Sequence, residues 1–299
     1  MKKIILSDEV KKALTDKKPV VALESTVITH GLPKPKNLET ARLMESAVRA
    51  ESSVPATIGF LKGDIHVGLN AEELERLANS ESAIKVSRRD IAGAIIKKLD
   101  GGTTVSGTMT IANLAGIKIF ATGGIGGVHR GNHMDISADL PTLSKIPLIV
   151  VCSGAKSILD LPKTREYLET EGVPIIGFQT DELPAFYSPN SGLKVDFRFD
   201  DPRDVADFAK IHWDLGLSTA ILVTVPPPAE SSLPSDYMEE MINLAISEAG
   251  DRQITGAATT PFLLDRISKQ TGQRSLEANV ALLKNNACVA GKIAVEFYR

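Results

Sequence analysis

Short runs of apolar residues recur along the chain and alternate with amphipathic segments. The runs are rich in Val and Ile and lie at positions 19–23, 56–61, 117–121, 147–152, 174–178 and 220–225. Unbroken apolar runs of this length are typical of strands buried on both faces, as in parallel sheets covered by helices. The amphipathic segments, which predict those helices, lie at positions 38–50, 71–79, 88–99, 162–171 and 202–215. This alternation predicts an α/β fold.

The pattern changes after residue 225. Residues 226–235 are rich in Pro and Ser and predict a loop rather than a regular element. The remainder of the chain is patterned as helices with little strand, and it is too short to build a second parallel sheet. We therefore expect the C-terminal helices to pack back on the same domain.

Composition and charge narrow the class of protein. The 299 residues are 43% hydrophobic and 24% charged, which is typical of a globular protein and excludes a disordered chain or a collagen-like or coiled-coil rod. With a net charge of −3 and no basic tract, we expect no binding to nucleic acid. Two Cys residues cannot form a disulfide framework and favour a reducing compartment, so we expect a cytoplasmic protein. The three apolar residues at 4–6, near the N-terminus, are too few for a signal peptide, and no stretch approaches the 18 uncharged apolar residues of a membrane span.

The first candidate for chemistry is Glu24, which directly follows the first apolar run. Ligands of open α/β sheets bind outside the carboxyl ends of the strands, so Glu24 has a suitable position for an acid or a base. The alternative is that Glu24 only caps a following turn.

A second candidate is the segment 101–110, in which small and hydroxyl residues precede a helical pattern at 109–114. Backbone N–H groups at a helix N-terminus and nearby hydroxyls suit an anion such as phosphate, although the spacing of a P-loop is absent. A capped helix start explains the same residues. The cluster of Lys85, Arg88 and Arg89 offers one cation for a phosphate, or a solvated helix start.

The third candidate is the Gly-rich segment 121–131, which follows a predicted strand. His129 stands where a dinucleotide-binding fingerprint would need its third Gly, so that function is not indicated. Closely spaced Gly residues still predict backbone that approaches a ligand or another segment. Downstream, His133, Asp135 and Asp139 add an imidazole and carboxylates of the kind that suit Mg²⁺ or Mn²⁺. A solvated Asp135 is the alternative.

The fourth candidate is Lys156, in a turn of small residues after the buried run that ends at Cys152. An ordinary lysine is neutral in about one molecule in 2,500 at pH 7, so nucleophilic use requires a site that favours the neutral amine. The alternative is a surface lysine in a loop. Cys152 is expected to pack as a small apolar side chain.

Taken in order, the motifs at these places resemble one family. They are Glu-Ser-Thr-Val-Ile-Thr-His-Gly at 24–31, Thr-Val-Ser-Gly-Thr-Met at 104–109, Phe-Ala-Thr-Gly-Gly-Ile-Gly-Gly-Val-His-Arg-Gly at 120–131, Asp-Ile-Ser-Ala-Asp-Leu at 135–140 and Cys-Ser-Gly-Ala-Lys-Ser-Ile-Leu-Asp at 152–160. Further matches lie at 172–180, 260–264 and Asn279. The chain resembles the pseudouridine-5′-phosphate glycosidase family, also called the indigoidine synthase A-like family.

The resemblance implies an activity and an assembly. The activity is reversible cleavage of the C–C glycosidic bond of pseudouridine 5′-phosphate to uracil and ribose 5-phosphate, a glycosidase reaction formally classed with the hydro-lyases. The implied fold is one three-layer α/β/α domain over residues 1–299, with a mostly parallel central sheet and a helical C-terminal segment. A homotrimer, one Mn²⁺ per subunit and a pseudouridine kinase as pathway partner are implied as well.

The resemblance also assigns residues. Lys156 matches the nucleophile, Glu24 the proton donor, and Asp135 the metal ligand, which holds the ion largely through water. The positions that match substrate contacts are Lys85, Thr104, Val105, Thr122, His129, Ser137, Ala138, Asp139 and Asn279, with Lys85 and the threonines on the phosphate side. Between His129 and Asp135 some relatives are two residues longer. The resemblance therefore specifies the ligands of the metal less fully than it specifies the nucleophile.

Two other functions use the same residues. A class I aldolase acting on a sugar phosphate would share the lysine, the phosphate site and an imine, and it differs in releasing no uracil. A non-catalytic sugar-phosphate-binding protein would keep the pocket and lose Lys156 or Glu24, both of which are present.

Overall fold

The computed structural model describes residues 4–131, 135–254 and 259–299. Its strands are β1 (Ile4–Leu6), β2 (Val20–Leu23), β3 (Val54–Leu61), β4 (Asp64–Val67), β5 (Ile84–Val86), β6 (Gly101–Thr103), β7 (Ile119–Ala121), β8 (Val128–His129), β9 (Ile149–Cys152), β10 (Leu159–Asp160), β11 (Ile175–Phe178), β12 (Phe197–Phe199) and β13 (Ile221–Thr224). Its α-helices are α1 (Asp8–Thr15), α2 (Lys36–Ala50), α3 (Ala71–Asn79), α4 (Ile91–Ile96), α5 (Val105–Ala115), α6 (Asp139–Leu143), α7 (Leu161–Thr170), α8 (Pro202–Asp214), α9 (Ser235–Asp251), α10 (Thr259–Gln270) and α11 (Arg274–Phe297). A π-helix spans Val27–Gly31, and a 3₁₀ turn spans Arg88–Asp90.

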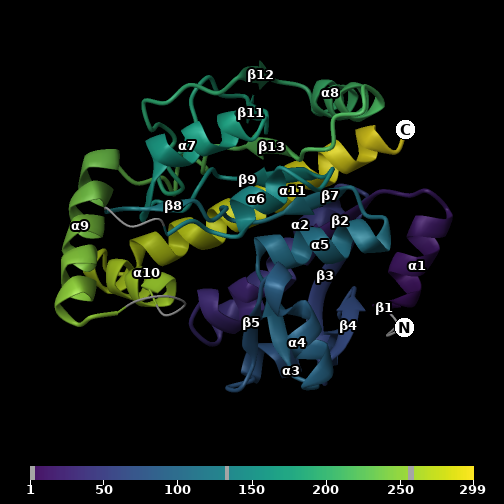
Figure 1. Cartoon of the computed structure of the whole chain (residues 1–299), viewed down its shortest axis with the longest axis horizontal. Helices are drawn as coiled ribbons and strands as arrows, with labels where there is room; N and C mark the ends of the chain where they lie inside the picture. The colour runs from purple at the N-terminus through teal and green to yellow at the C-terminus, as the bar shows by residue number, and fades with distance from the viewer. Residues whose placement is uncertain (1–3, 132–134, 255–258) are drawn as a thin grey trace.

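One large mixed sheet forms the centre of the fold (Figure 1). Its main strand order is β1-β4-β3-β2-β7-β9-β13-β11-β12, and β6 pairs with β3 and β5. Neighbouring strands from β3 through β2, β7, β9, β13 and β11 to β12 run parallel, whereas β3 pairs antiparallel with both β4 and β6. The predicted α/β fold with a mostly parallel sheet is confirmed. All residues of β2, β7, β9, β11 and β13 are buried, as their unbroken apolar runs predict.

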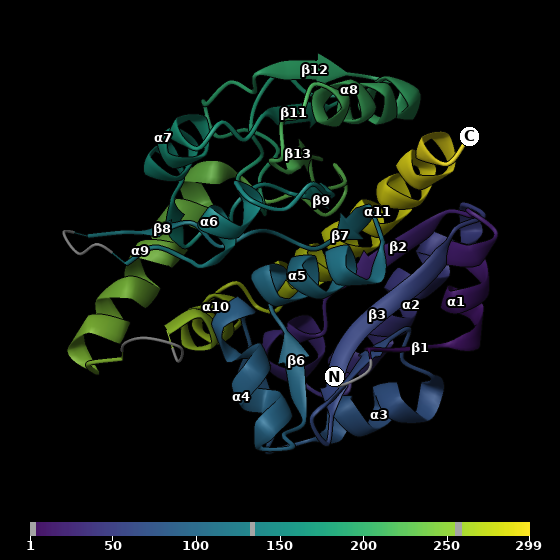
Figure 2. The same ribbon diagram turned by 45° about the vertical axis from the view of Figure 1, so that its right-hand side comes forward.

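Helices cover both faces of this sheet. Helix α11 packs on β2, β7 and β9 together with α2 and α8, and α5 packs on β2, β3 and β7 from the other side (Figure 1, Figure 2). Helix α11 passes close to the C-terminal end of α2. A Cβ added to Gly291 of α11 would lie 2.8 Å from the Cβ of Glu51, the residue that follows α2. The C-terminal helices therefore pack back on the sheet, as predicted. That residues 1–299 form a single domain stays a prediction.

The largest differences from the predicted helices are in two places. Helix α5 begins at Val105, four residues before the predicted start, because the Thr104 side chain caps it by accepting from the Gly107 N–H. The segment predicted as one helix over 88–99 is divided into the 3₁₀ turn and the short α4. Among the helices that the structure describes, not one combines the length and the apolarity needed to cross a membrane.

A buried amide joins α11 to the ends of two central strands. Asn286 is fully buried, and its Nδ2 donates to the Thr122 carbonyl oxygen at 2.9 Å, directly after β7. Its Oδ1 accepts from the Ser153 hydroxyl at 3.2 Å, directly after β9. Both strand ends carry candidate site residues, so this amide fixes the C-terminal helix to the site.

We expect Asn286→Ala to lower the free energy of unfolding by about 2–3 kcal/mol, because buried polar groups then lose their partners. The measurement is chemical unfolding followed by circular dichroism. Asn285→Ala is the matched control, since Asn285 is only half-buried and makes one hydrogen bond, of 3.4 Å, to the Pro226 carbonyl. Equal losses in the two variants would contradict the bridging role of Asn286.

Candidate active site

A cavity of about 570 Å³ opens where β2, β7 and β9 end. The π-helix, the N-terminus of α5, the Gly-rich segment after β7 and the turn after β9 contribute to its wall. It is lined by all but one of the residues that the sequence predicted for the site. Those in the lining are Glu24, Lys85, Thr104, Val105, His129, Asp135, Ser137, Ala138, Asp139, Lys156 and Asn279.

Glu24 lies at the carboxyl end of β2 with its side chain almost entirely buried. Burial raises the pKa of Glu24 above its ordinary value, and the nearby positive charge of Lys156 and the hydroxyl of Thr122 offset only part of that rise. A carboxyl group that is costly to ionise is suited to act as a proton donor. The position predicted from the sequence is therefore matched by a suitable environment.

Thr122 is the predicted site residue that does not line the cavity. It is fully buried at the end of β7, and its hydroxyl donates a hydrogen bond to the Glu24 carboxylate. The structure thus puts Thr122 behind Glu24, where it orients the carboxyl group. A sequence motif cannot distinguish a side chain in the cavity wall from one directly behind it.

Lys156 projects from the turn that follows β9. The turn is held against the Gly-rich segment by the Lys156 N–H, which donates to the Ile125 carbonyl at 3.1 Å, and by a parallel bridge between Ile125 and Ala155. Gly154 has a φ of +82°, and a Cβ there would lie 2.2 Å from the Pro184 carbonyl oxygen, so only glycine fits. The amine of Lys156 is close enough to influence both Glu24 and Lys85 electrostatically.

Lys85 lies in the middle of β5, at the same cavity. Burial, and then the positive charge of Lys156, lower the pKa of Lys85 to about 8. A second cation nearby therefore makes the charged form of Lys85 costly. A bound anion would relieve this cost, because it attracts both amines.

The N-terminus of α5 provides one open donor. The Ser106 N–H donates to Asp139 Oδ1 at 2.9 Å, and the Gly107 N–H is taken by the Thr104 side chain. In the described part of the chain the Val105 N–H has no hydrogen-bond partner, and Val105 lines the cavity. A helix N-terminus with an open N–H favours an anion, so Val105 and Lys85 together are suited to a phosphate.

Asp139 has an internal role as well as a place in the cavity wall. Its carboxylate accepts from the Ser106 N–H and, at 2.8 Å, from the Gly126 N–H. This buried carboxylate therefore ties the Gly-rich segment to the start of α5. Its interaction with two backbone N–H groups satisfies both oxygens, so it is not an open ligand for a cation.

Asp135 is the carboxylate with the most solvent access among those that line the cavity. Its side chain is 61% exposed, and its Oδ2 lies 3.9 Å from His129 Nδ1. Within residues 4–131, 135–254 and 259–299 there is no group of three or more His, Cys, Asp or Glu side chains that could enclose a metal. One exposed carboxylate does fit a hard cation that keeps most of its water. His133 lies outside the described residues, together with the rest of 132–134, which is part of the segment between His129 and Asp135 where some relatives are longer.

Several lining residues were not predicted. His30 lies in the π-helix after Glu24, and burial, followed by the charge of Lys85, lowers its pKa. Arg89, which the sequence marked only as one member of a cationic cluster, reaches the cavity with a mostly exposed side chain. Phe186 and Leu283 add apolar wall. No sequence signal marks a π-helix, although such turns occur often at functional sites.

Comparisons with known proteins show the family of this chain. The family model described as indigoidine synthase A like protein matches residues 9–296. The pseudouridine-5′-phosphate glycosidases of Caldanaerobacter subterraneus subsp. tengcongensis and Geobacillus kaustophilus are 55% and 51% identical over 295 residues, covering 98% of this chain and 96% and 98% of theirs.

Two solved structures have the same fold, each with a TM-score of 0.92 over 100% of this chain. One is the prealnumycin C-glycosynthase AlnA in complex with ribulose 5-phosphate, which is 40% identical with 98% of its chain covered. The other is an indigoidine synthase A-like protein from Thermotoga maritima, 37% identical with 97% covered. The chain belongs to the indigoidine synthase A-like family.

Proposed function

We propose that this protein is a glycosidase that cleaves the C–C glycosidic bond of pseudouridine 5′-phosphate to uracil and ribose 5-phosphate, reversibly. The observation that carries the proposal is the joint presence, in one cavity, of the buried carboxyl group of Glu24 and the amine of Lys156. Relatives about half identical over nearly the whole chain are named for this activity, and AlnA is a C-glycosynthase that holds a pentulose phosphate.

The bond to be broken sets the chemical problem. In a C-nucleotide the base is attached through carbon, so protonation of a leaving nitrogen cannot help. An electron source at C1′ is needed to expel the base, and a primary amine bonded to C1′ supplies one through its lone pair. Lys156 is the amine that we assign to this role.

The reaction begins with opening of the ribose ring. Glu24 donates its proton to the ring oxygen as the bond between that oxygen and C1′ breaks, and the neutral amine of Lys156 bonds to C1′. The ammonium formed by this addition then loses its proton, and the ionised Glu24 carboxylate accepts it. The raised pKa of Glu24 supports this step, because the acid must be protonated when substrate arrives.

The second half of the reaction releases both products. The nitrogen lone pair forms a C=N bond to C1′ while the C1′–C5 bond breaks and C5 of uracil takes up a proton from solvent, which leaves a protonated imine that returns one proton on hydrolysis. Water then hydrolyses the imine on Lys156 to give ribose 5-phosphate and the free amine. In the reverse direction the net reaction loses water, which is the basis for classing it with the hydro-lyases.

The phosphate is assigned to the side of the cavity with Lys85, Thr104 and the Val105 N–H. Binding energy from this remote group orients the sugar toward Glu24 and Lys156. Asp135 would hold a hydrated Mn²⁺, which supplies positive charge for the base and for ordered water. A homotrimer and a pseudouridine kinase that produces the substrate complete the proposal.

Lys156→Met should lower kcat by roughly 10³-fold or more, because the electron source at C1′ is removed. The measurement is uracil release followed by ultraviolet absorbance, which also separates this activity from an aldolase. Borohydride with ribose 5-phosphate should trap an adduct on Lys156, identified by peptide mass mapping. Lys163→Met is the matched control, since Lys163 is an exposed lysine that pairs with Asp160 outside the cavity.

In the same test, Glu24→Gln separates the role of Glu24 in ring opening from the role of Lys156 as nucleophile. It should lower turnover of the closed-ring substrate by about 10²–10⁴-fold. Trapping of ribose 5-phosphate, whose open-chain aldehyde needs no ring-opening acid, should fall much less. Full activity in Lys156→Met, or an adduct on another lysine, would contradict the proposed mechanism.

Ribose 5-phosphate binding should weaken as the pH rises through about 8, because Lys85 is charged below its pKa and neutral above it. In Lys85→Arg, whose side chain stays charged, affinity should be nearly constant between about pH 7 and pH 9.5. Isothermal titration calorimetry in matched buffers measures both. Constant affinity in the unmodified protein would remove Lys85 from the phosphate site.

Exhaustive chelation should lower kcat, and added Mn²⁺ should restore it. Asp135→Asn should then need about tenfold or more Mn²⁺ for half-maximal activity, since a neutral amide binds a hard cation less tightly than a carboxylate. Asp181→Asn, an exposed residue paired with Arg198, is the control. Activity that survives chelation unchanged would contradict the metal assignment.

A further inference from the structure

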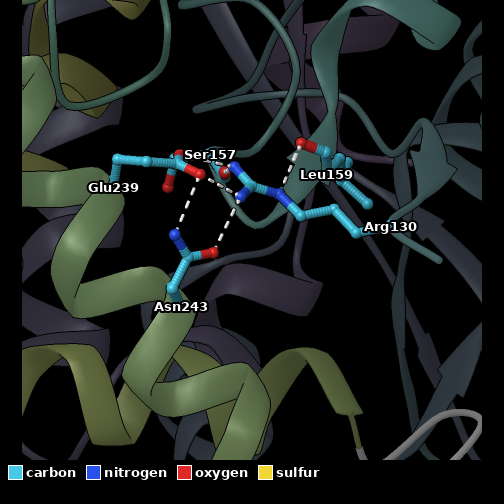
Figure 3. A network of polar contacts seen from close by, with 5 residues as sticks. All are labelled: Arg130, Ser157, Leu159, Glu239 and Asn243. Carbon is cyan, nitrogen blue, oxygen red and sulfur yellow. Dashed lines mark hydrogen bonds and ion pairs between the residues drawn. The ribbon is translucent and has the colours of Figure 1, made fainter.

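Arg130 makes a network of polar contacts with the residues that follow Lys156 and with helix α9 (Figure 3). Its Nη2 donates to the Ser157 carbonyl at 3.1 Å, and its Nε donates to the Leu159 carbonyl at 3.3 Å. The same guanidinium meets helix α9, where Nη1 and Nη2 lie 2.5 and 2.8 Å from the two oxygens of Glu239. Asn243 Oδ1 accepts a further hydrogen bond at 3.3 Å.

The network lies behind the wall of the candidate active site and not inside it. Lys156, Ile158 and Leu159 line the cavity of the site, whereas Ser157 faces a second cavity of about 390 Å³ together with Arg130 and Glu239. The turn from Lys156 to Leu159 is therefore a thin partition between two cavities. A partition with open space on both sides needs a support, and Arg130 provides one from the outer side.

Other contacts hold this turn as well. The Lys156 N–H donates to the Ile125 carbonyl, the Leu159 N–H donates to the Lys156 carbonyl, and β10 pairs with β8 through Leu159 and His129. Ile158 and Leu159 are buried in the core. The carbonyls of Ser157 and Leu159, in addition, both accept from one guanidinium. Its planar fork can serve two carbonyls and a carboxylate together, which the compact ammonium of lysine cannot do.

The anchor on α9 is charged and stable. Hydrogen bonding to Arg130 lowers the pKa of Glu239, which therefore remains ionised well below neutral pH. The Arg130 side chain is 26% exposed and that of Glu239 is 52% exposed, so only the guanidinium side of the pair is shielded from water. Charge-assisted bidentate contacts of this kind are among the strongest hydrogen bonds in proteins.

We infer that Arg130 is a positioning residue, which fixes the amine of Lys156 by holding the Ser157 and Leu159 carbonyls against Glu239 and Asn243 of α9. This inference rests on the proposed role of Lys156. Arg130 does not line the active-site cavity, so its effect passes through the backbone of the turn. Displacement of a reacting group by about 1 Å is enough to cost up to 10²-fold in rate.

Arg130→Met should lower kcat and the rate of borohydride trapping on Lys156 by about tenfold or more and by similar factors. The KM for pseudouridine 5′-phosphate should change less than threefold, because the phosphate side is untouched. Arg130→Lys should not restore the rate, whereas ethylguanidinium added to Arg130→Ala should restore part of it. Glu239→Gln keeps the hydrogen-bond acceptor and should give a smaller loss than Arg130→Met.

Arg165→Met is the matched control for the loss of a surface arginine network. Arg165 is 20% exposed, donates to the Lys194 carbonyl at 3.0 Å, and pairs with Glu169 and Asp196, away from the Lys156 turn. The two variants should show similar shifts in unfolding temperature, and only Arg130→Met should lose trapping rate. If Arg130→Met does not fold, Glu239→Gln and Asn243→Ala take its place, and their trapping rates are compared with that of Arg165→Met.

The outcomes separate the inference from the proposed function. If the unmodified enzyme forms an adduct on Lys156, but the trapping rate and kcat of Arg130→Met are within twofold of those of Arg165→Met, the positioning role alone is overturned. Turnover by the unmodified enzyme without any adduct on Lys156 overturns the nucleophile and the inference together. An adduct on Lys156 in the unmodified enzyme, a selective loss in Arg130→Met and rescue of Arg130→Ala by ethylguanidinium together support both.

Discussion

The site depends on the parallel adjacency of β2, β7 and β9. These strands are far apart in the sequence, yet their pairing brings Leu23, Ala121 and Cys152 to the same edge of the sheet. The residues that follow them are Glu24, Thr122 and the turn to Lys156. Because parallel strands place all their carboxyl ends on one side, an acid, its hydrogen-bond partner and an amine converge without any local sequence signal that links them.

Electrostatics inside the cavity follow from this convergence. Burial raises the pKa of Glu24, and burial together with the charge of Lys156 lowers the pKa of Lys85, so the site carries less charge than its residues suggest. A dianionic phosphate at Lys85 and the Val105 N–H would compensate these cations locally. A chain with a net charge of −3 can therefore bind an anion without a global basic surface.

The sequence predicted the central strands, the main helices and most of the site, because long apolar runs and residues at strand ends are local features. It missed β4 and β12, since short strands with exposed positions lack such a run. It also missed the burial of Thr122 and the backbone contacts of Asp139, which arise when β7, α5 and the Gly-rich segment meet. The π-helix that brings His30 to the cavity has no periodic pattern of its own to read.

Contacts between distant parts of the sequence also hold the turn that bears Lys156. Its turn begins with small residues, which let the amine reach the cavity, and continues into Ile158 and Leu159, which are buried in the core. Elements distant in the sequence add hydrogen bonds, through Arg130 and α9 on one side and through Asn286 of α11 at Ser153. Residues from the C-terminal third thus hold a strand end near the middle of the chain. This interdependence is why we propose that residues 1–299 fold as a single domain.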